Sequence, residues 1–546
     1  MAFPNTSAGV YDQDNDLSQR GGTVISSIGA AVIEAPMGST EEWTLVTDKQ
    51  DLKTKFGIKD FGKYGFGMHC AEHFLTESRM YIKRAIDKTT ALTAGAYLSV
   101  DDITANEPVL KLVNFDKGDN APKGVLGNPA ETIGFVVGTP GVENLLMMIY
   151  ATSPGEWSNA VSVRIRPSNQ QGTAVGEFSN PKHFYVEVFL NYLGTGSMPV
   201  ESYLCSRALE LDGEQQQMFV EARINGNSKY IRVKNNDLCP NIDIRTTTFE
   251  LLDGGEDGNR ASVADVISAW DGIEDTDDYA VQILINAGIT SPYVQQHMIS
   301  IAEKRGDAIA IVDLPREFEE VSKAINYRRN TLNLSNSFGA MYAPFCEITD
   351  DVSGKKFMCP PSGLVAAAYA FTDRNKAYYW APAGISRGKL KVTNLNRKYS
   401  LPERNALQQA QINYVRRIPK RGFVIMEQLT LQTFESGYQN VNVRRLVNGI
   451  KSVIRKAFLP SVFNPNDDLE RFSLKSLVDT EAAKVKRGRG LYDWETICDE
   501  RNNTPALIAN NDMAIDFIID PSIPATRASL TADIRNFGSS INFNEA

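Results

Sequence analysis

The 546-residue chain is several times longer than one ordinary domain, so we expect about three or four packed units. Hydrophobic residues make up 42% of it and charged residues 23%, which is ordinary for a folded protein and excludes wholesale disorder. A formal net charge of −9 argues against a general nucleic-acid binder, because such proteins need a basic surface to displace counterions from phosphates.

From the sequence we expect neither a secretory signal nor a membrane-spanning helix. Residues 1–19 have neither the basic nor the apolar region of a secretory signal. The most apolar stretch, residues 363–371, is far shorter than the roughly 20 residues that a membrane helix needs. The six cysteines lie far apart without a CxxC pair, so we expect reduced thiols that serve as small hydrophobic groups.

Both ends of the chain are predicted to be extended arms. Residues 1–22 and 528–546 mix polar residues with too few apolar groups to offset the entropy of ordering them alone. We therefore expect each arm to need a partner surface. The apolar residues available for such a contact are Val10, Tyr11, Leu17, Ile534, Phe537, Ile541 and Phe543.

Residues 23–86 are predicted to open a central α/β domain that resumes over 246–400. The first part gives an apolar strand closed by Pro36, a helix that ends at Gly57, and a helix–strand pair up to Ile86. In the second part, apolar strands alternate with helices, which is typical of a parallel sheet covered on both faces. The centre is therefore predicted to be a doubly wound α/β layer.

Two further units complete the predicted organisation. Residues 87–245 give mainly β signals spaced by Gly, Asn and Pro turns, which indicates a β-rich and outward-facing insertion. Residues 401–527 are predicted to form a C-terminal α/β domain that opens with a helix over 403–416 and a strand over 422–432. An amphipathic helix over 441–458 follows, and then a second helix and two strands.

Motifs of nucleotide-binding enzymes are missing from the sequence. No GxGxxG follows a strand, and GxxxxGK[ST] does not occur. The turn LDGGEDGN carries carboxylates that would repel a phosphate, and Ala264 stands where a calcium loop would need Glu. His69 and His73 are four residues apart, but in the order HCAEH rather than HExxH. We predict no catalytic, metal or cofactor site, and a hydrolase built on the alternating segment 251–315 is the enzyme alternative.

Basic residues gather in the predicted C-terminal unit of this acidic protein. They either form solvated faces or meet an acidic partner, for which charge complementarity would set the register. One group of these basic residues lies in the segment YVRRIPKRG. The residues that we select as facing such a partner are Arg444, Lys451, Arg455, Lys484, Lys486 and Arg487.

Several segments, taken in order, carry a family resemblance. They are AGVYDQDNDLS, GAAVIEAPMGSTEEWTLVTDKQDLKTKFG, TSPGEWSNAVSVRI, FELLDGGEDG, KRGDAIAIVDLP, AAAYAFTDRNKAYYWAPAG and NYVRRIPKRGFVIMEQLTL with NVRRLVNGIKSVIRKAF. Together they resemble contractile phage tail sheath proteins and their relatives in other contractile injection systems. Ser158 stands where the family usually has Gly, and the Met426 segment departs from the family pattern. Residues 87–140 match nothing in it.

The resemblance implies a structural protein without enzymatic activity or cofactor. It implies hexameric rings stacked helically around an inner tail tube, with baseplate and tail terminator proteins as further partners, no direct contact with nucleic acid and no insertion into a membrane. The arms would add strands to small sheets of neighbouring subunits, and the basic C-terminal surface would face the tube. The implied location is the virion tail sheath, assembled in the host bacterial cytoplasm. A sheath of a non-phage injection system is the alternative that the residues leave open.

Overall fold

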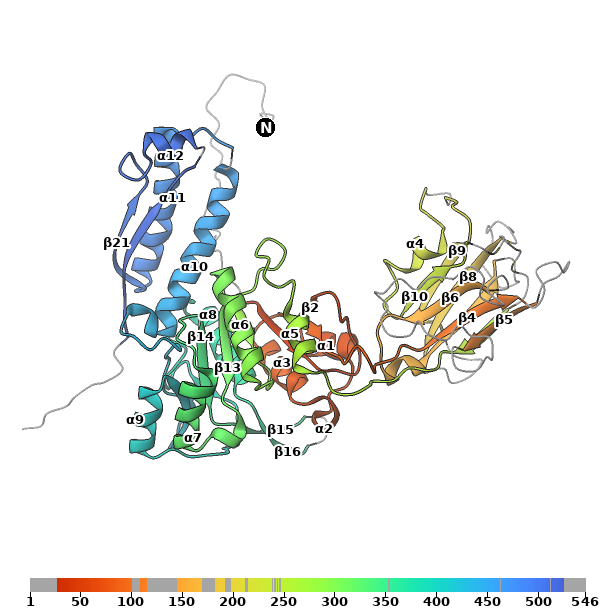
Figure 1. The fold of residues 1–546 in the computed structure, drawn as a ribbon, viewed down its shortest axis with the longest axis horizontal. Coiled ribbons are helices and arrows are strands. Elements are labelled where there is room, and N and C mark those ends of the chain that lie inside the picture. Colours follow the sequence, from red (N-terminus) through yellow and green to blue (C-terminus); the bar gives the residue numbers. More distant parts are fainter. Residues whose placement is uncertain are drawn as a thin grey trace, which may run out of the picture.

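The protein has three lobes in the computed structural model: a central α/β domain, a β-sandwich on one side and a helical C-terminal lobe on the other (Figure 1). In the described part of the chain, no helix is long and apolar enough to cross a membrane. The predicted arms and their seven selected residues lie outside the described residues. The structure describes residues 27–524 except 101–108, 115–144, 169–181, 192–197, 212–214, 238, 240–241, 243, 245–246, 352–353, 462 and 511.

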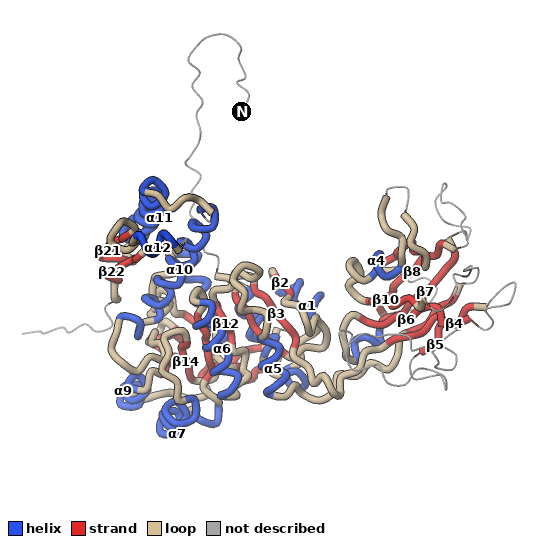
Figure 2. The backbone as a smooth tube through the Cα atoms, turned by 45° about the horizontal axis from the view of Figure 1, so that its top comes forward, coloured by secondary structure: helices blue, strands red, loops and turns tan. Residues whose placement is uncertain are grey.

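A nine-stranded sheet forms the centre of the protein (Figure 2). Its strands follow the order β17-β20-β19-β14-β13-β12-β1-β3-β2. The strands from β19 to β3 run parallel, whereas β20, β17 and β2 pair antiparallel at the two ends. The bounds are β1 Gly29–Ile33, β2 Thr44–Val46, β3 Met80–Arg84, β12 Ile283–Ile285, β13 Ile309–Asp313, β14 Gly339–Ala343, β17 Lys389–Leu390, β19 Ile412–Ile418 and β20 Gly422–Ile425.

Helices cover both faces of this sheet. Along β1, Ala31 and Ile33 belong to the core beneath α1, α3 and α8, whereas Ala30 and Val32 belong to the core beneath α5, α6, α7 and α9. The pleat sends successive side chains to opposite faces of the sheet, so a strand that is apolar throughout must be covered on both faces. The prediction of a doubly wound α/β centre is confirmed. The bounds are α1 Lys49–Phe56, α2 Phe61–Tyr64, α3 Gly67–Leu75, α5 Val263–Trp270, α6 Pro292–Arg305, α7 Val321–Asn326, α8 Ser362–Asn375 and α9 Leu401–Gln409.

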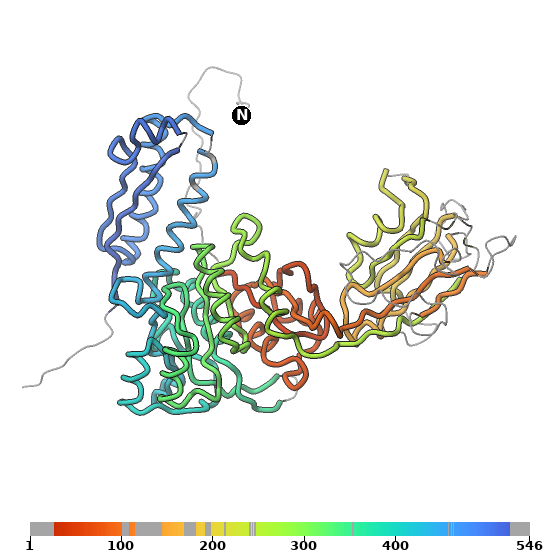
Figure 3. Tube along the Cα trace, in the orientation of Figure 1, coloured from red at the N-terminus to blue at the C-terminus, as the bar shows by residue number. Residues whose placement is uncertain are grey.

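The inserted lobe is a sandwich of two four-stranded antiparallel sheets. Their strand orders are β10-β6-β4-β5 and β11-β7-β8-β9, and apolar side chains from both sheets form one core. Figure 3 shows the chain leaving the central domain after β3 and returning after β11. The bounds are β4 Gly95–Val100, β5 Leu110–Asn114, β6 Leu145–Ala151, β7 Val161–Pro167, β8 His183–Leu190, β9 Glu201–Ser206, α4 Val220–Ile224, β10 Ile231–Asn235 and β11 Thr248–Leu251.

The C-terminal lobe consists of two long helices and a two-stranded sheet. Leu446 and Ile450 of α10 pack against Ala482 and Val485 of α11 and against Leu491 at the start of β21. The bounds are α10 Val441–Phe458, α11 Asp468–Arg487, β21 Leu491–Ile497, α12 Pro505–Ala509 and β22 Asp516–Pro521. A separate three-stranded sheet on the central domain contains β15 Cys346–Thr349, β16 Lys356–Cys359 and β18 Asn394–Leu395.

Two predicted boundaries are wrong. The boundary at residue 401 cuts through the central domain, because β19 pairs in parallel with β14 and α9 contributes Leu407 to a central core. The C-terminal lobe begins instead with α10. The boundary at residue 246 is also early, because β11 pairs with β7 of the sandwich.

Two predicted elements of the same region are shorter than expected. The helix predicted over 403–416 ends at Gln409, and Gln411 with φ 56° starts the turn into β19. The strand predicted over 422–432 ends at Ile425. In both places apolar residues beyond the observed end, such as Val415 and Leu431, belong to the cores of the central domain, and local periodicity does not record that contact.

Candidate assembly surfaces and the neck between the lobes

The two-stranded sheet of the C-terminal lobe is open for further strands. β21 and β22 are paired from Leu491 opposite Pro521 to Ile497 opposite Asp516, and no described strand pairs with either outer edge. An isolated two-stranded ribbon is only marginally stable in water, and an unpaired strand edge is a template for another chain. The sheet is therefore a candidate site for strand addition.

The two faces of the β21–β22 sheet, called the ribbon below, differ in their burial. Trp494, Phe517 and Ile519 pack toward the core between α10 and α11. On the other face, Tyr492 is 63% exposed and Ile518 is 55% exposed. The ribbon is thus anchored on one side and keeps apolar surface available on the other.

Arg444, selected as a partner-facing residue, is buried, and this selection is wrong. Its side chain donates a hydrogen bond to Asn448 Oδ1 at 3.1 Å and another to Ser337 Oγ at 3.1 Å. The guanidinium lies 4.0 Å from the centre of the Phe338 ring and 4.4 Å from that of Tyr438. The polar stripe of α10 therefore faces the central domain at its N-terminal end, where hydrogen bonds and aromatic rings satisfy the charge.

The other five selected residues, Lys451, Arg455, Lys484, Lys486 and Arg487, are exposed on α10 and on the last turn of α11. Two of them have acidic neighbours, Lys484 with Glu481 at 2.5 Å and Lys486 with Asp493 at 3.0 Å. Burial, together with the charges of Arg444 and Arg455, lowers the pKa of Lys451. Because α10 and α11 stand side by side (Figure 1), the structure brings the five into one lobe, although partly neutralised.

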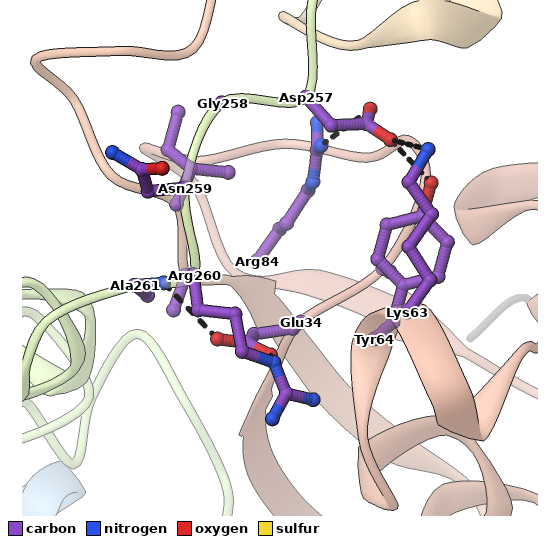
Figure 4. Close-up of a pocket in the computed structure, with 12 residues that line it drawn as sticks. Glu34, Lys63, Tyr64, Arg84, Asp257, Gly258, Asn259, Arg260 and Ala261 are labelled. Carbon is purple, nitrogen blue, oxygen red and sulfur yellow. Dashed lines mark hydrogen bonds and ion pairs between the residues drawn. The ribbon is translucent and has the colours of Figure 1, made fainter.

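The neck between the central domain and the sandwich is held by charged groups (Figure 4). The carboxylate of Asp257 accepts hydrogen bonds from Tyr64 Oη at 2.5 Å and from the backbone nitrogen of Glu156 at 3.0 Å, and it pairs with Lys63 Nζ at 2.6 Å. Burial disfavours the ionised form of Asp257, but the hydrogen bonds from Lys63 and Tyr64 outweigh it and lower the pKa. The ionised carboxylate thus joins α2 to the returning chain.

Two more pairs fix the same junction. Arg84, at the end of β3, is buried and donates to the carbonyl of Pro154 at 2.5 Å, and its burial lowers the pKa to about 10. Glu34, just after β1, accepts from the backbone nitrogen of Ala261 at 3.1 Å and pairs with Arg260 at 3.3 Å. Burial raises the pKa of Glu34 although Arg260 opposes this. The carboxyl end of β3 is therefore tied to the sandwich, and that of β1 to the chain that returns from it.

Two of the family-like segments meet at this neck. Asn159 of the segment TSPGEWSNAVSVRI donates to the carbonyl of Gly255 at 2.9 Å and accepts from its nitrogen at 2.8 Å. A Cβ at Gly255 would collide with Ser158 Oγ and with the Gly155 carbonyl, so the contact requires glycine. The sequence shows both segments but not their contact.

Of the histidine pair on α3, His69 is buried and His73 is partly buried. His69 Nε2 lies 3.7 Å from Asp350 Oδ1, and burial lowers the pKa of His73 to about 4. Among the described residues, no group of three or more His, Cys, Asp and Glu side chains could hold a metal ion. All six cysteines are buried and free, as expected for small hydrophobic groups.

Residues 259–431 match the central domain of phage tail sheath proteins. This segment of the chain therefore carries a phage tail sheath central domain. The tail sheath protein of Enterobacteria phage T4 is 28% identical over 297 residues, which cover 50% of this chain and 44% of that protein. The tail sheath protein of Vibrio phage KVP40 is 30% identical over 194 residues, which cover 35% of this chain and 29% of that protein. The chain thus matches less than half the length of these sheath proteins.

The fold extends beyond the family domain. The crystal structure of a sheath tail protein from Listeria innocua aligns with 87% of this chain and 89% of its own, with a TM-score of 0.53 and 10% sequence identity. This likeness concerns the fold alone. It covers most of the sheath fold, including regions outside residues 259–431.

Proposed function

We propose that the protein is a structural, non-catalytic subunit of a contractile tail sheath. In this function, copies polymerise as stacked hexameric rings around an inner tube and contract to drive the tube through the target cell envelope. The observation that carries the proposal is the sheath central domain joined to a C-terminal ribbon whose two outer edges pair with no described strand. A hydrolase built on the central sheet is not favoured by the family, and a sheath of a non-phage injection system has the same architecture.

The arms link the subunits in this proposal. An arm from a neighbour extends the β21–β22 ribbon by main-chain hydrogen bonds, and its alternate side chains set the register. Such a link can persist while the lobes of neighbouring subunits slide past one another, which lets the lattice shorten without falling apart. The side chains proposed for this contact are Val10, Tyr11, Leu17, Ile534, Phe537, Ile541 and Phe543.

The C-terminal lobe faces the inner tube. Lys451, Arg455, Lys484, Lys486 and Arg487 form the positive surface that meets an acidic tube wall. Exposed ion pairs contribute about 0 to 1 kcal/mol each, so a few of them hold the tube in register and release it together on contraction. The remaining partners are the baseplate and tail terminator proteins, and the site of action is the virion tail after assembly in the host cytoplasm.

Negative-stain electron microscopy of three purified forms tests this function. The full chain and a matched control without residues 1–7 are expected to form striated tubes, whereas a chain without residues 1–22 is expected to form none. The control keeps Val10, Tyr11 and Leu17, so it separates loss of the linking residues from simple shortening. Circular dichroism and a thermal melt verify that each form folds. Tubes from the chain without residues 1–22, or a full chain that stays monomeric at high concentration, would refute the arm-linked sheath.

A further inference from the structure

A groove of about 350 Å³ lies on the central domain, away from the C-terminal ribbon and from the neck. It runs between the end of α3, one side of α8 and the segment 385–391. Leu364, Ala367 and Phe371 of α8 give it an apolar wall, and Ile385 is 48% exposed beside them. Exposed apolar surface in a groove is typical of a binding site for another segment of protein.

The opposite wall of the groove is basic. Lys389 and Lys391 are exposed and form no ion pair with any described residue, and Arg387 lies beside them over the ring of Trp380 at 5.0 Å. Glu77 is the one carboxylate among the described residues that line the groove, and Arg374 neutralises it. The groove therefore suits an occupant that is both apolar and acidic.

The N-terminal arm has this composition. Residues 8–18, AGVYDQDNDLS, combine three large apolar side chains with Asp12, Asp14 and Asp16 and contain no Lys or Arg. The C-terminal arm matches less well, because residues 528–546 balance Arg535 against two carboxylates. Charge complementarity thus selects the N-terminal arm.

The root of this arm lies on the same helix as the groove. The hydroxyl of Ser27 donates to the carboxylate of Asp373 on α8, two residues beyond Phe371 in the groove wall. The ten residues from Leu17 to Ser27 span about 33 Å when extended. The diameter of a helix with its side chains is about 10–12 Å, so the arm can pass around the end of α8.

The strand beside the groove also has room for a neighbour. β17 is the terminal strand of the nine-stranded sheet and pairs only with β20 among the described strands. An extended segment in the groove can therefore add backbone hydrogen bonds to its side-chain contacts.

We propose that residues 10–17 of a free subunit dock in this groove of their own chain. The tether through Ser27 gives the arm an effective concentration on the order of millimolar at the groove, so even weak docking occupies it. The docked arm cannot reach a neighbour, and its release becomes a step of polymerisation. This consequence rests on the proposed sheath function, whereas the docking itself does not.

Zero-length cross-linking of the full chain tests the docking. A carbodiimide couples aspartate carboxylates to lysine amines that touch, and mass spectrometry identifies the pairs. An equal mixture of ¹⁴N- and ¹⁵N-labelled chains, diluted until sedimentation shows monomers, distinguishes contacts within a chain from contacts between chains. We expect Asp12, Asp14 and Asp16 to couple to Lys389 and Lys391 in pairs of one isotope. Mixed-isotope pairs, or equal coupling to the exposed Lys398 outside the groove, would overturn the proposal.

An arm variant separates docking from simple charge attraction. Val10→Ser, Tyr11→Ser and Leu17→Ser together keep the three aspartates and change no residue of the groove, and we expect at least a fivefold lower yield. The matched control Gln13→Ser, Asn15→Ser and Gln19→Ser changes polar residues of the same arm and should leave the yield unchanged. An undiminished yield in the first variant would overturn the proposal. Because cross-linking is read on monomers, its outcome is independent of whether the chain forms tubes.

Discussion

The pH dependence of the central domain follows from one buried carboxyl group. Asp313 ends β13, the fourth of the parallel strands counted from the β3 end of the parallel run, and its side chain is fully buried. It accepts hydrogen bonds from the nitrogen and the hydroxyl of Ser362, both at 2.7 Å, and from the nitrogen of Gly288 at 3.2 Å. Burial outweighs these hydrogen bonds and raises the pKa of Asp313 to about 7.

The sign of the effect is set by the order of the two pKa values. In the unfolded chain an aspartate has a pKa of about 3.9, so between that value and about 7 the folded protein holds a proton that the unfolded chain has released. This stabilises the folded state at low pH, and the contribution is lost as the pH rises through about 7. Between pH 5 and pH 8 the loss amounts to about 2 to 3 kcal/mol.

The variant Asp313→Asn removes this titration. Its amide cannot accept from both backbone nitrogens, so one buried donor loses its partner at a cost of about 1–3 kcal/mol that does not depend on pH. We therefore expect the free energy of unfolding of the wild type, relative to the variant, to fall by about 2 to 3 kcal/mol from pH 5 to pH 8. Comparing the two proteins at each pH cancels the contributions of the titratable groups that they share.

Hydrogen exchange gives the required measurement. Both proteins are equilibrated across a urea series at pH 5 and at pH 8, and a short deuterium pulse is read by mass spectrometry on peptides of β12 and β13, so that unfolding of the central sheet is followed by itself. A difference between the proteins that stays constant within about 0.5 kcal/mol, or that grows with pH, would refute the reasoning, since half a kcal/mol is far below the expected linkage.

Two further variants test contacts between elements. The guanidinium of Arg445 pairs with the buried carboxylate of Asp373 at 2.9 Å, so Arg445→Ala leaves that carboxylate without its cation. We expect the stability of α10, measured by hydrogen exchange, to fall by about 3–5 kcal/mol. Adding Asp373→Leu should restore most of this loss, and an equal loss in the single and double variants would argue against the ion pair. Gly363→Ala places a Cβ 2.5 Å from the Cys70 carbonyl, so α3 and α8 must separate, at an expected cost of about 1–3 kcal/mol in a thermal melt; an unchanged melt would contradict this close approach.

Several features of the protein could be predicted from local sequence. Apolar strands that alternate with helices indicate a doubly wound sheet, because a strand with no polar face must be covered on both sides. Gly306 ends α6 in the left-handed conformation with φ 70°, as a glycine directly after a helix commonly does. The order of short motifs along the chain led to the sheath family. Each of these signals depends on residues that are close in sequence.

Tertiary contacts decided the rest. Periodicity identified the polar stripe of α10, but Arg444 on that stripe lies between the rings of Phe338 and Tyr438 rather than in solvent. In the same way, Asp257 becomes the centre of the neck only because the fold brings Lys63 and Tyr64 to it across a long insertion. A sequence records which side chains are polar, whereas the burial of a charge depends on partners that only folding supplies.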